Sequence, residues 1–199
     1  MAGMIVVPHR GLETAKTRLA PILSPDQRVD LARRLLERVL AAVTDVGRIR
    51  VVVISPDPAL RDVVERAGAE LLVQRGMGLN AGLEQARAAA VEQRVELLGV
   101  LHGDLPELES DDIRALLEAA AEPAGVAIAP DRSGAGTNGL AMRPPHAIPF
   151  RFGPGSFEAH VAASDAAGLL IAVVDRPGLA FDLDTPADLE RLLARETPR

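Results

Sequence analysis

The strongest constraint on the fold is the alternation, along the whole chain, of short apolar runs with segments of helical periodicity. Residues 3–8 and 50–55 are continuous apolar runs typical of buried strands. Between them, residues 24–43 carry leucine and valine at helical spacing, behind a capping box formed by Ser24 and Gln27. Helices of this length between strands predict βαβ crossovers and a largely parallel central sheet with helices on both faces.

The same two patterns continue to the end of the chain. Further strands are predicted at residues 69–73, 95–101, 125–130, 139–143 and 169–174. Further helices are predicted at residues 58–67, 79–92, 110–120, 156–167 and 186–193. No internal repeat, low-complexity block or linker divides the sequence, so residues 1–199 are expected to form one domain. The region 131–160 is rich in Gly, Pro and Ser, which is typical of a binding loop.

Composition excludes several classes of protein. The 199 residues are 48% hydrophobic, which is too apolar for a disordered chain and enough for a sizeable core. No apolar run approaches the ~18 residues of a membrane span, and no secretion signal is visible. Without cysteine there is no disulfide or thiolate zinc site, so a reducing cytoplasm is the expected location. A net charge of −6 and few aromatic rings argue against a nucleic-acid partner and favour small-molecule substrates.

The loop after the first strand is rich in cations. In open α/β sheets, ligands bind beyond the carboxyl ends of the strands, so residues that follow strands are the first candidates for a site. This loop holds Arg10, Lys16 and Arg18, and Lys16 is the only lysine in the chain. Lys16 is either a compact ammonium that contacts phosphate or a solvated surface lysine. Its place among other cations favours phosphate, although the loop does not have the spacing of a P-loop.

A glycine-rich turn, RGMGLNAG at residues 75–82, follows another strand and opens a helix. One interpretation is a tight turn with Asn80 as helix N-cap. The other is close approach of the Gly78 backbone to a nucleotide base or ribose. The third glycine is one residue late for a dinucleotide fingerprint, which disfavours a nicotinamide-dependent oxidoreductase.

Three aspartates lie at predicted strand ends. Asp104 follows the apolar run 95–101, and Asp182 and Asp184 lie two residues apart, on one face if their segment is extended. Carboxylates placed in this way are typical ligands of Mg²⁺ in phosphate-binding sites. Helix capping is the alternative, but Thr185 and Asp188 already supply the cap. The four scattered histidines do not form a zinc site and are expected to be structural or exposed.

A last candidate region combines glycines with hydroxyl side chains, in GAGTN at residues 134–138 and FGPGSF at residues 152–157. A helix is predicted to begin near Ser156, and the free N–H groups of a helix N-terminus bind anions. Ser156 can cap its helix and a small carboxylate or phosphate can use the same N–H groups, so the two interpretations are compatible.

Taken together, these segments resemble the 2-phospho-L-lactate guanylyltransferase family, which includes the phosphoenolpyruvate guanylyltransferases. The resemblance runs from about Ile5 to Leu192 and keeps the family's order of PHRGLETAKTRLAPILSPDQR, GLNAG, GDLP, GTNGLAMRPP, FGPGSFEAH and AFDLDTPADL. GDLP and DxDTP are shared with other nucleotidyltransferases, whereas AKTRL, GTN and FGxxSFxxH are more specific. The sequence departs from the family at His9, where an aliphatic residue is commoner, and at Met142, which interrupts a run richer in leucine.

The resemblance implies a single-domain, Rossmann-like nucleotidyltransferase fold of the GT-A-like kind. It implies a reaction that joins GTP to 2-phospho-L-lactate or phosphoenolpyruvate with release of pyrophosphate, in the biosynthesis of the deazaflavin coenzyme F-420, with Mg²⁺ as cofactor. The implied site consists of metal ligands Asp104, Asp182 and Asp184, acid-binding residues Thr137, Gly153 and Ser156, triphosphate-binding cations Arg10, Lys16 and Arg18, and guanosine-facing residues Gly78 and Asn80.

Two other functions on the same fold stay open. A sugar-phosphate or molybdenum-cofactor nucleotidyltransferase would use the same metal chemistry but lacks the GTN and FGxxSF segments. A non-catalytic nucleotide-binding module would keep the glycine-rich turns and have no need of all three aspartates.

Overall fold

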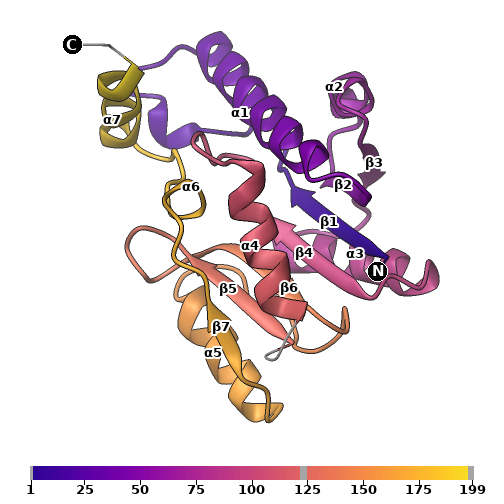
Figure 1. Cartoon of the computed structure of the whole chain (residues 1–199). Coiled ribbons are helices and arrows are strands. Elements are labelled where there is room, and N and C mark those ends of the chain that lie inside the picture. The colour runs from indigo at the N-terminus through magenta and orange to yellow at the C-terminus, as the bar shows by residue number, and fades with distance from the viewer. Residues whose placement is uncertain (1, 122–124, 197–199) are drawn as a thin grey trace.

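A central sheet of seven strands organises the chain, in the order β3-β2-β1-β4-β6-β5-β7 (Figure 1). The computed structural model describes residues 2–121 and 125–196. The strands are β1 (Gly3–Pro8), β2 (Ile49–Ser55), β3 (Glu70–Val73), β4 (Leu97–Leu101), β5 (Val126–Pro130), β6 (Thr137–Met142) and β7 (Ile171–Val173). The helices are α1 (Pro25–Asp45), α2 (Arg61–Arg66), α3 (Leu79–Glu92), α4 (Ser110–Ala121), α5 (Ser156–Ala166), α6 (Pro177–Ala180) and α7 (Pro186–Glu196). Two 3₁₀ turns are η1 (Thr17–Leu19) and η2 (Pro58–Leu60).

The predicted start of the first helix is confirmed atom by atom. Gln27 donates its backbone N–H to Ser24 Oγ at 3.3 Å, and Ser24 donates its own N–H to Gln27 Oε1 at 2.9 Å. Pro25 occupies the first turn, where its missing N–H is not needed. Local sequence therefore determines where α1 begins.

The sheet is mostly parallel, as predicted, with one exception. Strands β1, β2, β3 and β4 pair in parallel, whereas β6 runs antiparallel to both β4 and β5. The loop between β5 and β6 spans only residues 131–136, which is too short for a crossover and forms a hairpin. The predicted helix at 58–67 is divided into η2 and α2, and neither η1 nor α6 was predicted because elements this short carry no periodicity.

Helices cover both faces of the sheet, as expected. Along β1, Ile5 and Val7 pack into the core under α1, α2 and α4, whereas Met4 and Val6 pack into the core over α3 and α5. This alternation follows from the period of two along a strand. In Figure 1, α4 crosses in front of the strands, whereas α3 lies behind them.

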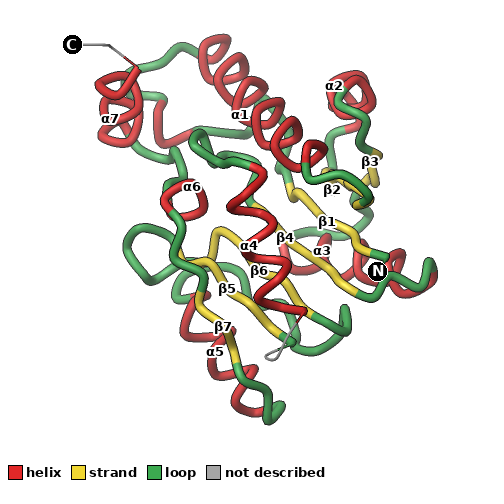
Figure 2. Tube along the Cα trace, in the orientation of Figure 1, coloured by secondary structure: helices red, strands yellow, loops and turns green. Residues whose placement is uncertain are grey.

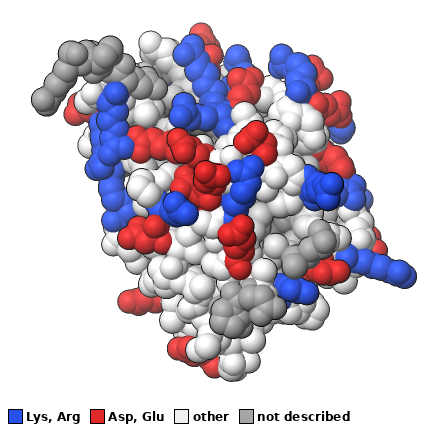
Figure 3. Space-filling view, in the orientation of Figure 1, with Lys and Arg blue, Asp and Glu red and all other residues white. Residues whose placement is uncertain are grey.

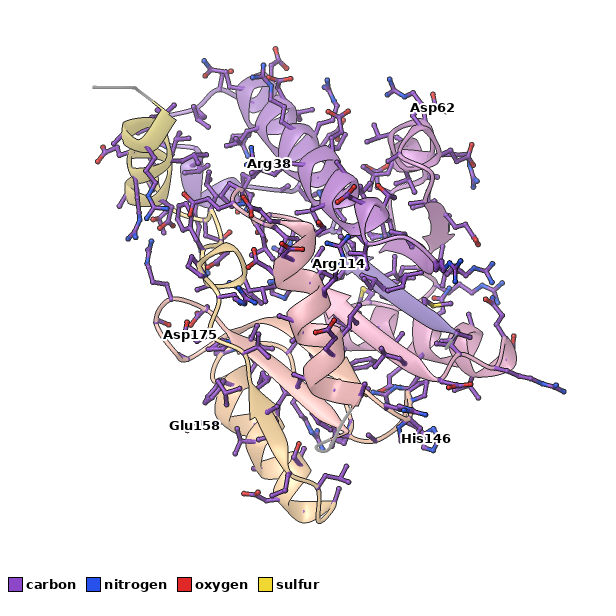
Figure 4. All side chains as sticks on the ribbon, viewed as in Figure 1. Arg38, Asp62, Arg114, His146, Glu158 and Asp175 are labelled. Atoms are coloured by element: carbon purple, nitrogen blue, oxygen red, sulfur yellow. The ribbon has the colours of Figure 1, made fainter. Side chains whose placement is uncertain are left out.

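Polar contacts join the helices of the front layer. Arg114 of α4 donates a hydrogen bond to the backbone oxygen of Asp45 at the end of α1, at 3.0 Å (Figure 4). Basic and acidic side chains are interspersed on this face of the molecule (Figure 3). None of the helices within the described residues combines the length and the apolar character that a bilayer span requires.

The topology gathers the candidate site at one edge of the sheet. Because β1, β2 and β4 are parallel, the segments that follow them begin at the same edge. The loop after β4 also meets the segment between α6 and α7, where Leu183 donates its N–H to the backbone oxygen of Asp104 at 3.1 Å. Figure 2 shows the segment between α6 and α7 as a loop.

Candidate active site

A cleft of about 440 Å³ opens at this edge of the sheet. Segments that follow four parallel strands form most of its wall, and α1 and the segment before α7 complete it. The lining residues that carry polar or backbone groups relevant to ligand binding are His9, Arg10, Lys16, Thr17, Arg18, Gln74, Gly78, His102, Gly103, Asp104 and Asp184.

Lys16 lines the cleft and contacts both of its aspartates. Its Nζ donates to Asp104 Oδ2 at 2.6 Å, to the backbone oxygen of Leu183 at 2.5 Å and to Asp184 Oδ1 at 3.1 Å. Only 5% of the Lys16 side chain is exposed. The interpretation of Lys16 as a solvated surface lysine is therefore wrong, and the cation from the first loop does meet the carboxylates from the middle and end of the chain.

The charges of this cluster stabilise one another. Burial lowers the pKa of Lys16, but Asp104 and then Asp184 outweigh it, so the pKa is raised above its ordinary value. Burial raises the pKa of Asp104, but the charge of Lys16 outweighs it and the pKa is lowered. Both groups are consequently ionised at neutral pH.

The backbone at Lys16 adopts an uncommon conformation. Its φ of 55° and ψ of 32° lie in the left-handed region, immediately before η1. A side chain other than glycine or asparagine is seldom found there. The three hydrogen bonds of Nζ offset this local cost, which ties the loop conformation to the ion pair.

The two arginines of the loop are more exposed than Lys16. Arg18 donates to Asp184 Oδ2 at 3.2 Å, and 72% of its side chain is exposed. Arg10 also lines the cleft, and within the described residues its guanidinium forms no ion pair. The three cations predicted to bind the triphosphate thus all line the cleft, and Lys16 is the most buried of them.

Asp188 fixes the segment that carries the last two aspartates. Its Oδ2 accepts from Asp184 N at 3.2 Å, from Thr185 N at 2.8 Å and from Thr185 Oγ1 at 2.7 Å, while its Oδ1 accepts from Arg132 at 2.7 Å. The predicted capping role of Thr185 and Asp188 is confirmed. Asp182 and Asp184 are not used as caps; Asp184 lines the cleft, whereas Asp182 is not among the lining residues.

Asp182 lies beside the cluster and is held from β6. Asn138 donates to its Oδ1 at 3.4 Å. Burial raises the pKa of Asp182, and the negative charge of Asp104 raises it further. Asp104 Oδ1 is itself buried without a hydrogen-bond partner.

The three aspartates do not form a preformed metal-binding site. Among residues 2–121 and 125–196, no group of three or more His, Cys, Asp or Glu side chains has the arrangement of a metal site. The ammonium of Lys16 bonds Asp104 and Asp184 at once. The carboxylates of Asp104 and Asp184 are therefore close together, but the ammonium of Lys16 already bonds one oxygen of each.

The glycine-rich turn contributes Gly78 to the cleft wall. Gly78 has a φ of +90°, directly precedes α3, and has open space where a Cβ would stand. Asn80 does not line the cleft: its Nδ2 donates to the backbone oxygen of Phe152 at 3.0 Å, and its Oδ1 accepts from Phe152 N at 3.0 Å. Asn80 is thus fully used in joining the start of α3 to the loop before α5.

The three residues expected to bind the acid lie beside the cleft rather than in its wall. Thr137 and Ser156 are buried, and Thr137 Oγ1 lies 3.1 Å from His160 Nδ1. Gly153 has a φ of +134° and accepts from Ser156 N at 3.1 Å. None of these three residues lines the 440 Å³ cleft.

Phe152 lies between the cleft and the region around Thr137 and His160. Its ring centroid lies 5.6 Å from that of His102, which lines the cleft, and 4.9 Å from that of His160. Neither histidine was predicted to have a role in the site. The one available signal was the place of His160 in the FGPGSFEAH segment.

Solved structures identify the fold. A crystal structure from Desulfovibrio desulfuricans G20, described provisionally as a nucleotide-diphospho-sugar transferase, superposes with a TM-score of 0.81 at 18% identity, over 96% of this chain and 87% of that one. Glucosyl-3-phosphoglycerate synthase from Mycobacterium tuberculosis, solved with Mn²⁺, UDP and its product, superposes with a TM-score of 0.67 at 13% identity, over 98% of this chain and 76% of that one. The protein therefore has the GT-A-like fold.

Sequence comparison is more specific. The family model described as "Guanylyl transferase CofC like" matches residues 3–197. The phosphoenolpyruvate guanylyltransferase of Rubrobacter xylanophilus is 46% identical over 194 residues, covering 98% of this chain and 95% of that protein. The chain belongs to the CofC-like guanylyl transferase family, and it is a nucleotidyltransferase of the guanylyltransferase kind.

Proposed function

We propose that the protein transfers the guanylyl group of GTP to phosphoenolpyruvate, in the biosynthesis of the deazaflavin coenzyme F-420. An oxygen of the acid's phosphate attacks the α-phosphorus, a new P–O bond forms, and the bond to the β-phosphate breaks with release of pyrophosphate. The name of the Rubrobacter relative supports this acceptor over 2-phospho-L-lactate. The observation that carries the proposal is the convergence of Lys16, Asp104 and Asp184 at one cleft.

The chemistry needs charge stabilisation rather than a general base, because the attacking phosphate is already anionic at neutral pH. The barrier is the repulsion between two anions, and preorganised cations lower it. Lys16 supplies a buried ammonium, and Arg10 and Arg18 supply guanidinium groups at the rim. We assign these three residues to the triphosphate.

The carboxylates fit a divalent cation. The buried, unpartnered Oδ1 of Asp104 and the raised pKa of Asp182 both indicate more negative charge than the neighbouring side chains neutralise. Such hard oxygen donors suit Mg²⁺, and Asp104, Asp182 and Asp184 would hold it. When bound, the ion would neutralise charge on the triphosphate; the Mn²⁺ and UDP of the Mycobacterium neighbour are consistent with this use.

The assignments of the remaining residues differ in their support. Thr137, Gly153 and Ser156 are proposed to hold the acid, beside the cleft and across Phe152 from it. Gly78 is proposed to face guanosine through its open backbone. Asn80 was expected to do the same, and its double hydrogen bond to Phe152 favours a linking role between the two substrate regions instead.

A substrate panel tests the proposed reaction. Phosphoenolpyruvate, 2-phospho-L-lactate, 3-phosphoglycerate and a sugar phosphate are each mixed with GTP, ATP, CTP or UTP and Mg²⁺, and pyrophosphate release is measured. We expect release with GTP and phosphoenolpyruvate. Release with the sugar phosphate alone, or no release with any acceptor of the panel, would contradict the proposal.

Substitution of Asp104 tests the site. Asp104→Asn keeps the shape but removes the charge that pairs with Lys16, so turnover should fall by about 100-fold or more. Asp62→Asn, on the outer surface of α2 (Figure 4), is the matched control and should leave turnover unchanged. Equal turnover in both variants would remove Asp104 from the mechanism.

Lys16→Arg tests the need for a compact ammonium. A planar guanidinium cannot donate to the same three oxygens from the buried position of Nζ. Turnover should fall although the positive charge is kept. An unimpaired Lys16→Arg enzyme would show that any cation at this place suffices.

A further inference from the structure

His160 of α5 is a fully buried histidine whose two ring nitrogens each have a partner. Its exposed fraction is 0%. Nε2 lies 3.0 Å from the backbone N of Arg151, and Nδ1 lies 3.1 Å from Thr137 Oγ1. The ring thus bridges the loop before α5 and the first residue of β6.

The partners of the ring decide where its proton lies. A backbone N–H can only donate, so Nε2 accepts from Arg151 and carries no hydrogen. A neutral imidazole has one N–H, which must then be on Nδ1. Burial lowers the pKa of His160 to about 4, although a hydrogen bond with the backbone of Ser156 opposes the shift, so the ring is neutral at physiological pH.

This proton arrangement dictates the role of the Thr137 hydroxyl. Nδ1 carries a hydrogen and faces Thr137 Oγ1 at 3.1 Å, so it cannot accept a hydrogen bond from the hydroxyl. Within the described residues, Thr137 Oγ1 has no other hydrogen-bond partner, and the residue is 2% exposed. The hydroxyl hydrogen is left to point toward an acceptor that the described residues do not supply.

We infer that His160 is a positioning residue that commits the Thr137 hydroxyl to donate to an anionic oxygen of the acid substrate. The same ring holds the loop that carries Gly153, because it accepts from Arg151 N and packs edge-on against Phe152 at 4.9 Å between centroids. One neutral, buried imidazole thereby sets both the direction of a donor and the position of the neighbouring loop. This inference rests on the proposed function only in naming the acid as the ligand.

The proton arrangement is tested directly on the wild-type protein. Long-range ¹H–¹⁵N NMR correlations of the histidine rings distinguish an Nδ1–H tautomer from an Nε2–H tautomer. His160 should be the Nδ1–H tautomer between pH 6 and 8. An Nε2–H tautomer would overturn the inference whatever the enzyme's substrate is, and it would leave the proposed reaction untouched.

Two substitutions of His160 test the effect on the acid. Gln can place an acceptor near Nε2 without a donor at Nδ1, whereas Asn can place a donor near Nδ1. We expect His160→Gln to raise the KM for phosphoenolpyruvate about tenfold with the KM for GTP unchanged, and His160→Asn to stay closer to wild type. His146→Gln, at an exposed histidine (Figure 4), is the control.

Thr137→Val completes the test and covers the case in which a His160 variant does not fold. It removes the donor itself and should raise the same KM by a similar factor, whereas Thr137→Ser keeps the hydroxyl and should not. Combining Thr137→Val with His160→Gln should add little, because both remove one interaction. A purely structural His160 would lower stability in its variants without changing the ratio of the two KM values, and a Thr137→Val enzyme with the wild-type KM for the acid would also overturn the inference.

Discussion

Replacing Lys16 by methionine should lower the stability of the protein although the side-chain volume is nearly kept. The change removes the hydrogen bonds that Nζ gives to Asp104, Asp184 and Leu183 O. The Lys16 side chain is 5% exposed and that of Asp104 is 25% exposed, so their pair is shielded from water. The side chain of Asp184 is 40% exposed, so its ion pair with Lys16 contributes little to stability because solvent screens the charges.

The magnitude follows from the charge left behind. Breaking a buried ion pair by removing one partner costs about 3–5 kcal/mol. Partial exposure of Asp104 favours the lower end, about 3 kcal/mol. For a chain of 199 residues, each kcal/mol corresponds to roughly 2–4 °C, so the melting temperature should fall by about 6–12 °C.

The difference between wild type and Lys16→Met should depend on pH with a definite sign. Lys16 lowers the folded-state pKa of Asp104, so this pair contributes stability above the ordinary pKa of an aspartate and loses it as pH falls through the folded value. The pKa of Lys16 is raised above its ordinary value of 10.5, so the stabilisation by the ion pair is lost only as pH rises through that raised value. The difference in stability should be full at pH 7, begin to shrink as pH falls below about 4, and disappear only below the lowered folded-state pKa of Asp104.

Circular dichroism at 222 nm is the suitable assay, because the chain has no Trp or Tyr to report unfolding by fluorescence. Melting is followed with EDTA and without nucleotide, so that neither a bound metal ion nor a bound nucleotide offsets the loss of stability. Arg38→Met, at an exposed position of α1 (Figure 4), is the control for loss of a positive charge. A Lys16→Met protein that melts within about 1 °C of wild type at pH 7, or a gap that does not change with pH, would refute the reasoning.

Two further predictions concern the fold around the site. Gly11→Ala should destabilise the protein by about 1–3 kcal/mol, because its φ is +100° and a Cβ would lie 3.1 Å from Asp57 Cβ. Gly47→Ala, with a φ of +71° and open space, should cost less, and equal urea midpoints for the two variants would contradict the steric part of the argument. The unfolding free energy should also fall as pH drops from about 6.5 to 4, by up to about 3 kcal/mol each for His9 and His160, because their pKa values are lowered to about 4 and the unfolded chain takes up the protons first. A pH-independent urea midpoint across that range would exclude this contribution.

Periodicity and capping signals were sufficient to locate most elements. The strand predicted at residues 3–8 is β1, and the predicted helix behind Ser24 and Gln27 is α1. Burial is periodic along a strand or helix, so the pattern of apolar residues carries this information locally. The short helix α6 escaped prediction, because four residues complete only about one turn.

The candidate residues could be chosen from the sequence because ligands collect at the carboxyl ends of parallel strands. That rule selected Lys16, Asp104 and Asp184, and the structure brings them within hydrogen-bond distance. The strand end predicted before Asp184 was wrong, because Asp184 follows the short helix α6. The rule could not foresee that Asn80 is occupied by the backbone of Phe152, because the two residues are 72 positions apart.

By itself, the sequence determined the kind of fold, the beginning of α1 and the family, because each depends on local spacing or on motifs that keep their order. Only the tertiary structure decided which charges meet, which are shielded from water and which nitrogen of His160 carries the proton. Those properties depend on distances between segments far apart in the chain and on the loss of solvent around them, and no local pattern encodes either quantity.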